Sequence, residues 1–133
     1  MKTKLVGISA AVLGLLTMVM VMAAPSFAHH GTAAYDTHKQ STVMGTVSGF
    51  DFANPHALIY LDVKQPDGSV RKWQGRLTSP NLLARAGWTR ASLQLGQQIT
   101  VSGFPAKNGA NSIWIRKIVT SEGKELPRGI GDE

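Results

Sequence analysis

The histidines of this chain are the residues whose type and spacing indicate metal chemistry. His29 and His30 are adjacent, and His56 stands in the motif Asn54-Pro55-His56-Ala57. If a mature chain begins at His29, its α-amine and its ring Nδ1 can chelate one ion, and a second imidazole would complete a three-nitrogen site suited to Cu(II). Both kinds of group ordinarily titrate near neutral pH, so both can act as neutral ligands. We therefore name His29, His30 and His56 as candidate ligands of copper or another divalent metal.

Other interpretations of these histidines stay open. A mobile terminal His-His pair binds metal weakly without any biological role, and the ring of His56 could instead bond a nearby backbone carbonyl and hold its loop in place. His38 could also supply an imidazole, but less naturally than His56. Tyr35 and Asp36, shortly after the pair, could supply oxygen ligands, although anchoring of the N-terminal segment is the simpler role for both.

The residues before His29 have the pattern of an export signal. Two early lysines precede an apolar run from Leu5 to about Ala24, and the small residues Ser26 and Ala28 favour cleavage after Ala28. We expect residues 1–28 to be a cleaved signal peptide, and the mature protein to be periplasmic or secreted with no membrane span. The apolar run is also long enough to cross a bilayer, so an uncleaved anchor is the alternative.

Composition limits the function classes. Without residues 1–28, 105 of the 133 residues remain, which is enough for one domain, and the formal net charge falls from +6 to +4. The basic residues are scattered, as on a solvated surface, so we expect no nucleic acid as a partner. The chain has no cysteine, which excludes disulfides, thiol catalysis, iron–sulfur clusters and thiolate metal sites.

The chain after residue 40 has the pattern of short strands separated by turns. The clearest strand has Ile59, Leu61 and Val63 alternating with polar or exposed positions. Gln65-Pro66-Asp67-Gly68 and Asn108-Gly109 have the composition of tight turns. Five strands are expected, over residues 43–52, 57–64, 70–77, 96–103 and 112–120.

One short helix is expected between the third and fourth strands. Ser79 is a suitable N-cap, Pro80 suits the first helical position, and Gly87 suits a left-handed C-terminal cap, so the helix should cover residues 81–86. Three strands, a helix and two strands is the element order of an OB fold. We therefore predict an all-β protein with one short helix: an arm at 29–40, a five-stranded OB-like barrel at 41–126 and a flexible tail at 127–133.

Evidence for catalysis is slight. The sequence contains no glycine-rich phosphate loop, no nucleophile elbow and no close pair of carboxylates outside turns. The tryptophans Trp73, Trp88 and Trp114 could form a stacking platform for bases or sugars, but core packing is the simpler interpretation. We expect a protein that is not an enzyme.

A set of motifs resembles a family of small exported bacterial proteins of unknown function. The motifs are listed here in chain order: His29-His30-Gly31, Tyr35-Asp36, Gly45-Thr46-Val47, Asn54-Pro55-His56-Ala57, Tyr60-Leu61-Asp62-Val63, Ser79-Pro80-Asn81, Gly87-Trp88-Thr89 and Gly103. The resemblance covers residues 29 to about 126 and implies an exported β-barrel without an established activity. Family members typically have serine where this chain has Gly31, so a hydroxyl is missing at that position, and His38 is an addition to the pattern.

Three functions are compatible with these observations. The first is a periplasmic, non-enzymatic binding module that holds copper or another divalent metal through the His29 chelate and a loop histidine. The second is an envelope scaffolding barrel that binds an unknown envelope protein and no metal. The third is an OB module for an oligosaccharide or single-stranded nucleic acid, which the export signal and the modest charge disfavour. An oxidative copper enzyme would be the enzymatic extreme of the first function.

Overall fold

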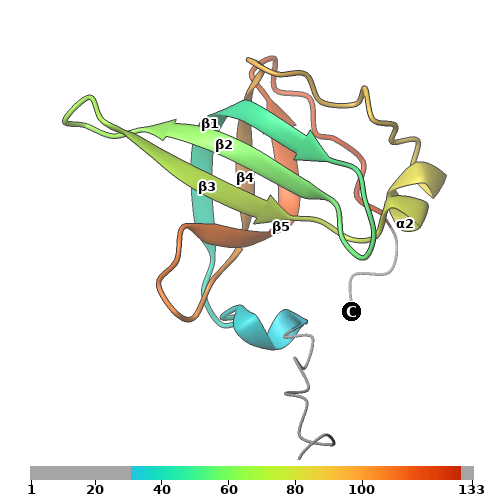
Figure 1. The fold of residues 1–133 in the computed structure, drawn as a ribbon, viewed down its shortest axis with the longest axis horizontal. Helices are drawn as coiled ribbons and strands as arrows, with labels where there is room; N and C mark the ends of the chain where they lie inside the picture. Colours follow the sequence, from blue (N-terminus) through green and yellow to red (C-terminus); the bar gives the residue numbers. More distant parts are fainter. Residues whose placement is uncertain (1–30, 130–133) are drawn as a thin grey trace, which may run out of the picture.

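The computed structural model describes residues 31–129. Figure 1 shows a small barrel with a short helix at one end, and the first described residues, from Gly31, lie below the barrel. The elements in chain order are η1 (Thr32–Ala34), β1 (Ser41–Asp51), β2 (Leu58–Lys64), β3 (Val70–Arg76), α2 (Pro80–Arg85), β4 (Gln98–Pro105) and β5 (Ser112–Thr120).

The five strands close into one barrel in the order β1-β2-β3-β5-β4. All pairs are antiparallel except β3 with β5, which run parallel over three residue pairs from Gln74–Ser112 to Arg76–Trp114. This strand order, with α2 between β3 and β4, is that of an OB fold, so the predicted fold class is confirmed. Closure leaves β1 hydrogen-bonded on both sides, to β2 and β4.

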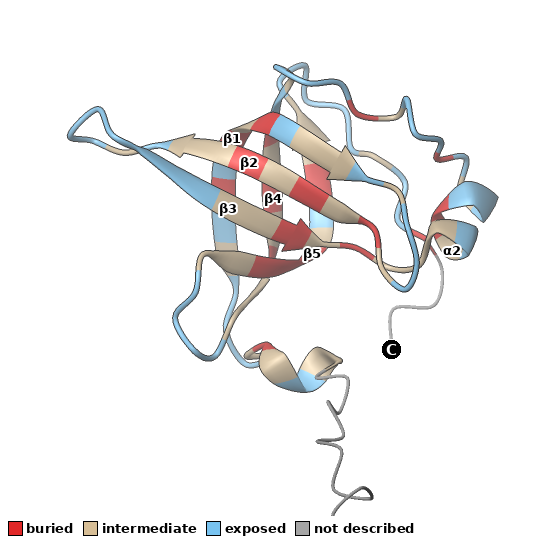
Figure 2. Cartoon of the chain, in the orientation of Figure 1, coloured by how far each residue is buried: buried red, intermediate tan, exposed pale blue. Residues whose placement is uncertain are grey.

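The core fills the barrel interior because inward residues recur at every second position of each strand. Ile59 and Leu61 of β2 are fully buried, as are Ile99 and Val101 of β4 and Ile113 of β5. Figure 2 shows buried stretches alternating with intermediate or exposed ones along the strands. Alternation of this kind places one face of each strand on the core and the other on the surface.

Gly103 allows β4 and β5 to approach more closely than side chains permit. A Cβ atom there would overlap the backbone carbonyl of Trp114 on β5. The pairing register of the two strands shifts between Ser102 and Gly103, which marks a bulge at this point. Ser102 pairs with Lys117 and Gly103 with Ile115, so Arg116 of β5 is the extra residue of this bulge. A bulge bends the strand that contains it, and a bent β5 helps to close a barrel of only five strands.

Helix α2 begins and ends as the sequence indicates. The hydroxyl of Ser79 accepts a hydrogen bond from the amide of Leu82 at 3.4 Å, Pro80 occupies the first turn, and Gly87 has a φ of 93°. Leu83 of this helix is buried in the barrel core. The helix therefore closes one end of the barrel.

The sequence predicts a flexible tail from residue 127, but residues 127–129 pack against the rest of the protein. The indole Nε1 of Trp88 donates a hydrogen bond to the carbonyl of Pro127 at 2.7 Å, and Gly129 is buried against Thr78 and Leu82. The bond explains the difference: a buried indole N–H needs an acceptor, and this segment provides one. Residues 130–133 lie outside the described part.

Two smaller details also differ from the sequence prediction. The arm contains the 3-10 turn η1, and β4 begins at Gln98 instead of residue 96. Gly96 has a φ of 85°, and its amide donates to the carbonyl of Val47, so this residue completes a turn before the strand begins. Between residues 31 and 129, no helix is long and apolar enough to cross a membrane.

Candidate functional site

The candidate ligands divide between the described and the undescribed parts of the chain. His29 and His30 lie outside the described residues. His56 lies in the loop between β1 and β2, residues 52–57, which includes a cis peptide bond between Asn54 and Pro55. The described part of the arm begins at Gly31, two residues after His29.

The β2–β3 register brings His56 to the end of β3. Leu58 of β2 pairs with Arg76 of β3, and two further backbone hydrogen bonds, both made by Ala57, continue this ladder past the strand ends. Because side chains alternate across a strand, His56 and Leu58 lie on the same outer face as Arg76. The histidine and the arginine are therefore neighbours on the outside of the barrel.

The arm is held beside the β4–β5 hairpin by backbone pairing. The amide of Asp36 donates to the carbonyl of Pro105 at 2.9 Å, and the amide of Lys107 donates to the carbonyl of Ala34 at 3.0 Å. Tyr35 forms an antiparallel bridge with Ala106 between these two bonds. Residues 34–36 therefore act as one more short strand segment on the end of β4.

A small aromatic cluster lies under the arm, outside the barrel core. Tyr35 and Trp114 are both buried, with ring centroids 6.3 Å apart, and the Tyr35 hydroxyl is 3.2 Å from that of Ser112. Phe104 packs edge-on to Trp114 at 5.6 Å, and the guanidinium of Arg116 lies 5.1 Å from the Trp114 ring. Tyr35 thus anchors the arm by burial against the outer surface of β5.

The three tryptophans do not share one environment. Trp88 is buried in the barrel core, and Trp73 packs partly buried against that core. Trp114 is buried outside the core, against Tyr35 of the arm and Phe104 of β4, whereas its neighbours Ile113 and Ile115 face the interior. Core packing therefore describes Trp73 and Trp88 but not Trp114.

Arg76 joins the arm to the 52–57 loop; we call this pair of contacts the Arg76 bridge. Its Nη1 donates to the carbonyl of Gly31 at 2.9 Å, and its Nη2 lies 2.7 Å from Nε2 of His56. The guanidinium also lies over the ring of Tyr35, with Cζ 5.9 Å from the ring centroid. One side chain therefore contacts the first described residue of the arm, its aromatic anchor and the loop histidine.

The chemistry of the Arg76 bridge fixes the role of each atom. A guanidinium has hydrogen-bond donors and no acceptor, so Nε2 of His56 accepts from Nη2 of Arg76. A neutral imidazole that accepts at Nε2 carries its proton at Nδ1. This tautomer is assigned from the Arg76 donor, since hydrogen positions are not observed. The Nδ1 atom of His56 is buried. The ring is therefore positioned with its accepting nitrogen toward the guanidinium of Arg76.

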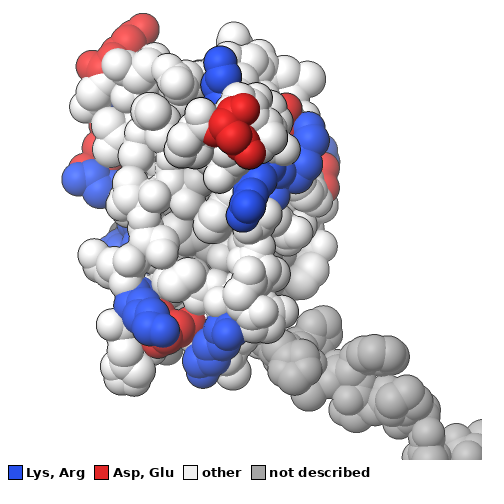
Figure 3. Space-filling model, turned by 90° about the vertical axis from the view of Figure 1, so that its left-hand side faces the viewer, with Lys and Arg blue, Asp and Glu red and all other residues white. Residues whose placement is uncertain are grey.

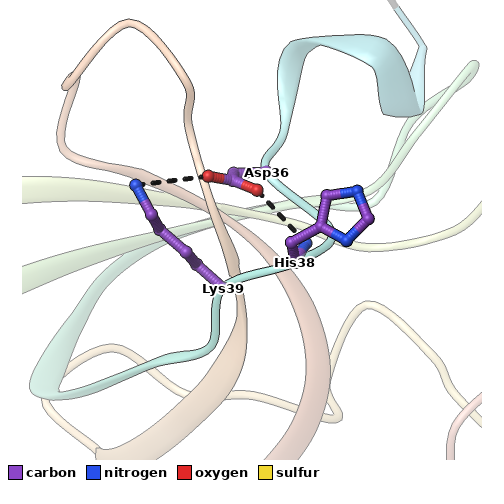
Figure 4. A network of polar contacts seen from close by, with 3 residues as sticks. All are labelled: Asp36, His38 and Lys39. Carbon is purple, nitrogen blue, oxygen red and sulfur yellow. Dashed lines mark hydrogen bonds and ion pairs between the residues drawn. The ribbon is translucent and has the colours of Figure 1, made fainter.

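His38 lies in the turn that joins the arm to β1. Its backbone amide donates to Oδ1 of Asp36 at 3.1 Å, and Nζ of Lys39 lies 3.3 Å from Oδ2. Figure 4 shows the His38 ring turned away from the carboxylate. These hydrogen bonds and the ion pair lower the pKa of Asp36, the bond from His38 having the largest effect. Asp36 thus stabilises a turn, and the hydrogen bond that His38 donates there comes from its backbone amide and not from its exposed ring.

The described residues contain no preformed cluster of metal ligands. Between residues 31 and 129, no group of three His, Cys, Asp or Glu side chains could hold an ion. Figure 3 shows that on one face of the molecule the basic side chains are separated by uncharged surface and mixed with acidic ones. That face carries no continuous basic stripe of the kind that tracks a nucleic-acid backbone.

Comparison with known proteins places the chain in a family. The model of DUF6152, a family of unknown function, matches residues 16–113. The chain belongs to this family. The match includes part of the expected leader, the arm, the 52–57 loop and the end of β3, so the residues of the Arg76 bridge lie within the family region. No curated protein matches the sequence.

Two of the similar solved structures are crystal structures of Rim1, a mitochondrial single-stranded DNA binding protein from S. cerevisiae. The first is 13% identical with a TM-score of 0.47, and covers 68% of this chain and 96% of its own. The second is 16% identical with a TM-score of 0.43, and covers 68% of this chain and 97% of its own.

Sequence reasoning missed Arg76 as a site residue. It counted Arg76 among scattered basic residues of a solvated surface, whereas the residue is only partly exposed and makes directed contacts. One signal could have identified it. The turn at Gln65–Gly68 fixes the register of the β2–β3 hairpin, and in this register Arg76 lies opposite Leu58. His56 is two residues before Leu58 on the same face, so the register alone predicts that Arg76 and His56 are neighbours.

Proposed function

We propose that this protein is an exported, non-enzymatic binding module that holds copper or another divalent metal between its mature N-terminus and His56. The mature chain would begin at His29 in the periplasm or outside the cell, after removal of residues 1–28. The α-amine and ring of His29 would form a chelate, and His56 would add an imidazole, with His30 as a further candidate ligand.

The Arg76 bridge is the observation that carries this proposal. The Gly31 carbonyl and Nε2 of His56 both contact one guanidinium group, at 2.9 and 2.7 Å. Two residues of extended chain span at most about 7 Å, so a chelate at His29 is within reach of the 52–57 loop.

The position of the arm also favours metal over nucleic acid as the ligand. OB folds bind oligonucleotides on the strand 2–3 face and with the loops after strands 1 and 4. Here residues 34–36 pair with the start of the β4–β5 loop, and Tyr35 covers Trp114. An aromatic side chain that a base could otherwise stack on is therefore occupied by the protein itself.

A Cu(II) titration followed by EPR tests the proposal. The protein that begins at His29 is compared with a variant that carries one extra N-terminal residue, which removes the α-amine chelate and leaves every side chain in place. We expect tight one-to-one binding with a nitrogen-rich signal that the extension abolishes. Weak binding, or binding that is indifferent to the extension, would reject the metal function and favour the envelope scaffold.

A further inference from the structure

We propose that the outer face of strands β1, β2 and β3 binds a neutral oligosaccharide, with a sugar ring stacked on the side chain of Tyr60. The binding surface consists of Gly49, Asp51, Leu58, Tyr60 and Gln74, and we call it the Tyr60 platform. All five residues belong to the barrel strands. The proposal goes beyond the metal function and does not depend on it, because the platform includes neither the arm nor the 52–57 loop.

The ring of Tyr60 is held against β1. Tyr60 and Gly49 are cross-strand partners, and a Cβ atom at Gly49 would come within 2.9 Å of Cδ2 of the ring. The hydroxyl donates to Oδ2 of Asp51 at 3.0 Å, so the far end of the side chain is also fixed on β1. Tyr60 is only partly buried, and because these contacts all lie on the β1 side, the exposed part of the ring is the side away from the glycine.

Polar groups lie on both sides of this ring. Gln74 of β3 pairs directly with Tyr60, and Asp51 pairs with Leu58, so all four side chains share the outer face. Among residues 31–129, neither the side-chain amide of Gln74 nor Oδ1 of Asp51 has a hydrogen-bond partner. Neighbouring strands are about 5 Å apart, so the ring, the amide and the carboxylate can contact one ligand together.

The charges around the platform favour a neutral ligand. Two acidic residues, Asp51 and Asp62, and two basic residues, Lys72 and Arg76, border Tyr60 on the three strands, and their formal charges cancel. Both cations already have partners: Nζ of Lys72 lies 2.6 Å from Asp62, and Arg76 forms the Arg76 bridge. A nucleic acid would need cations directed at its phosphates, and here they are directed at the protein.

The chemistry of a pyranose matches these groups. A pyranose with equatorial hydroxyls has flat faces formed by C–H groups and a rim of hydroxyls. The faces pack on an aromatic ring, and the hydroxyls bond to carboxylate and amide side chains, which fix the orientation of the sugar. The Tyr60 ring, Oδ1 of Asp51 and the Gln74 amide supply one group of each kind. Chains of β-1,4-linked glucose or N-acetylglucosamine are therefore the ligand class that fits the platform.

An NMR titration of the metal-free protein tests the proposal, with cellotetraose and chitotetraose as probes at millimolar concentrations. We expect amide shifts at residues 49–51, 58–60 and 74. Tyr60→Leu and Tyr60→Phe are a matched pair, because both lack the hydroxyl and both cover Gly49, but only phenylalanine keeps a flat ring. We expect Tyr60→Leu to bind at least about tenfold more weakly than Tyr60→Phe. Gln74→Ala should also weaken binding, and spectra without sugar show which variants are folded.

The outcomes separate a binding role from a structural one. Equal affinities of Tyr60→Leu and Tyr60→Phe would show that the ring only covers Gly49, and would overturn the proposal. An absence of shifts with both tetrasaccharides would also overturn it, as would shifts caused by an oligothymidylate alone, which would assign the platform to nucleic acid. If Tyr60→Leu does not fold, unchanged affinity in Gln74→Ala overturns the proposal instead. None of these results alters the Cu(II) titration, so the two proposals fail separately.

Discussion

Nη2 of Arg76 lies 2.7 Å from Nε2 of His56, although 20 residues of chain separate them. The β2–β3 register creates this contact, because Leu58 pairs with Arg76 and the ladder continues through Ala57. A loop histidine next to a proline would ordinarily be one of the more mobile residues of a barrel. Here its ring is held from β3, and the same guanidinium holds Gly31.

Tyr35 should anchor the arm mainly through its ring. Tyr35→Ala removes a buried ring that packs on Trp114 and should lower the free energy of unfolding by about 3 kcal/mol. Tyr35→Phe removes only the hydroxyl contact with Ser112 and should cost about 1 kcal/mol. Urea denaturation measures both values. Equal, small effects would mean that the arm detaches without affecting the barrel.

Gly103 should tolerate alanine less well than Gly75 does. A Cβ at Gly103 would overlap the backbone of Trp114, which is fixed in β5, whereas at Gly75 it would meet the end of the Ile115 side chain, which can change rotamer. Gly75→Ala should therefore cost about 1–3 kcal/mol, and Gly103→Ala more than that. Chemical denaturation of the two variants tests the order. The reverse order would show that β4 moves away from β5 more easily than Ile115 rearranges.

The barrel could be predicted from the sequence because its signals are local. Alternation at Ile59, Leu61 and Val63, the Ser79-Pro80 helix start and the Asn108-Gly109 turn each depend on a few neighbouring residues. The ends of all five strands and of the helix were predicted to within about two residues. The start of β4 differs because Gly96 belongs to a turn, so the strand begins at Gln98.

The candidate site could not be predicted in the same way because its contacts are long-range. Trp114 packs against a residue of the arm, Tyr35, and that contact depends on where the arm lies. Periodicity along β5 assigns Trp114 to the outer face, but it does not tell what covers it. The role of Arg76 requires both the hairpin register and the path of the arm.

Stability should fall as the solution is acidified. The pKa of Asp62 is lowered mainly by its hydrogen bond from Lys72 at 2.6 Å, that of Asp67 by Ser69 and that of Asp36 by the His38 amide. Folded pKa values below the unfolded ones stabilise the protein above the unfolded pKa, and the contribution is lost as pH falls through the folded pKa. Unfolding free energies measured from about pH 5 down to about pH 2 should decrease, and less steeply for Asp62→Asn. An unchanged slope in that variant would contradict the assignment.

Tyr60 should ionise at a higher pH than a free tyrosine. Its hydroxyl donates to Oδ2 of Asp51 at 3.0 Å, and this bond is the main cause that raises its pKa. The raised folded value means that the bond stabilises the protein below the unfolded pKa and is lost as pH rises through the folded pKa. The chain has two tyrosines, so a Tyr35→Phe background isolates Tyr60 in an ultraviolet titration. Asp51→Asn should lower the midpoint in that background, and an unchanged midpoint would exclude Asp51 as the cause.

His56 and His38 offer a matched pair for testing the metal site, because only one of them lies beside the start of the arm. His56 shares a guanidinium with Gly31, whereas His38 is exposed in the turn before β1 and only its backbone amide is engaged there. His56→Ala should weaken Cu(II) binding by mature protein at least tenfold, or about 1.4 kcal/mol, and His38→Ala should leave it unchanged. Calorimetric titration of both variants gives the comparison. Equal losses would indicate non-specific binding by exposed imidazoles, while no loss from either would restrict the site to the N-terminal residues and remove the 52–57 loop from it.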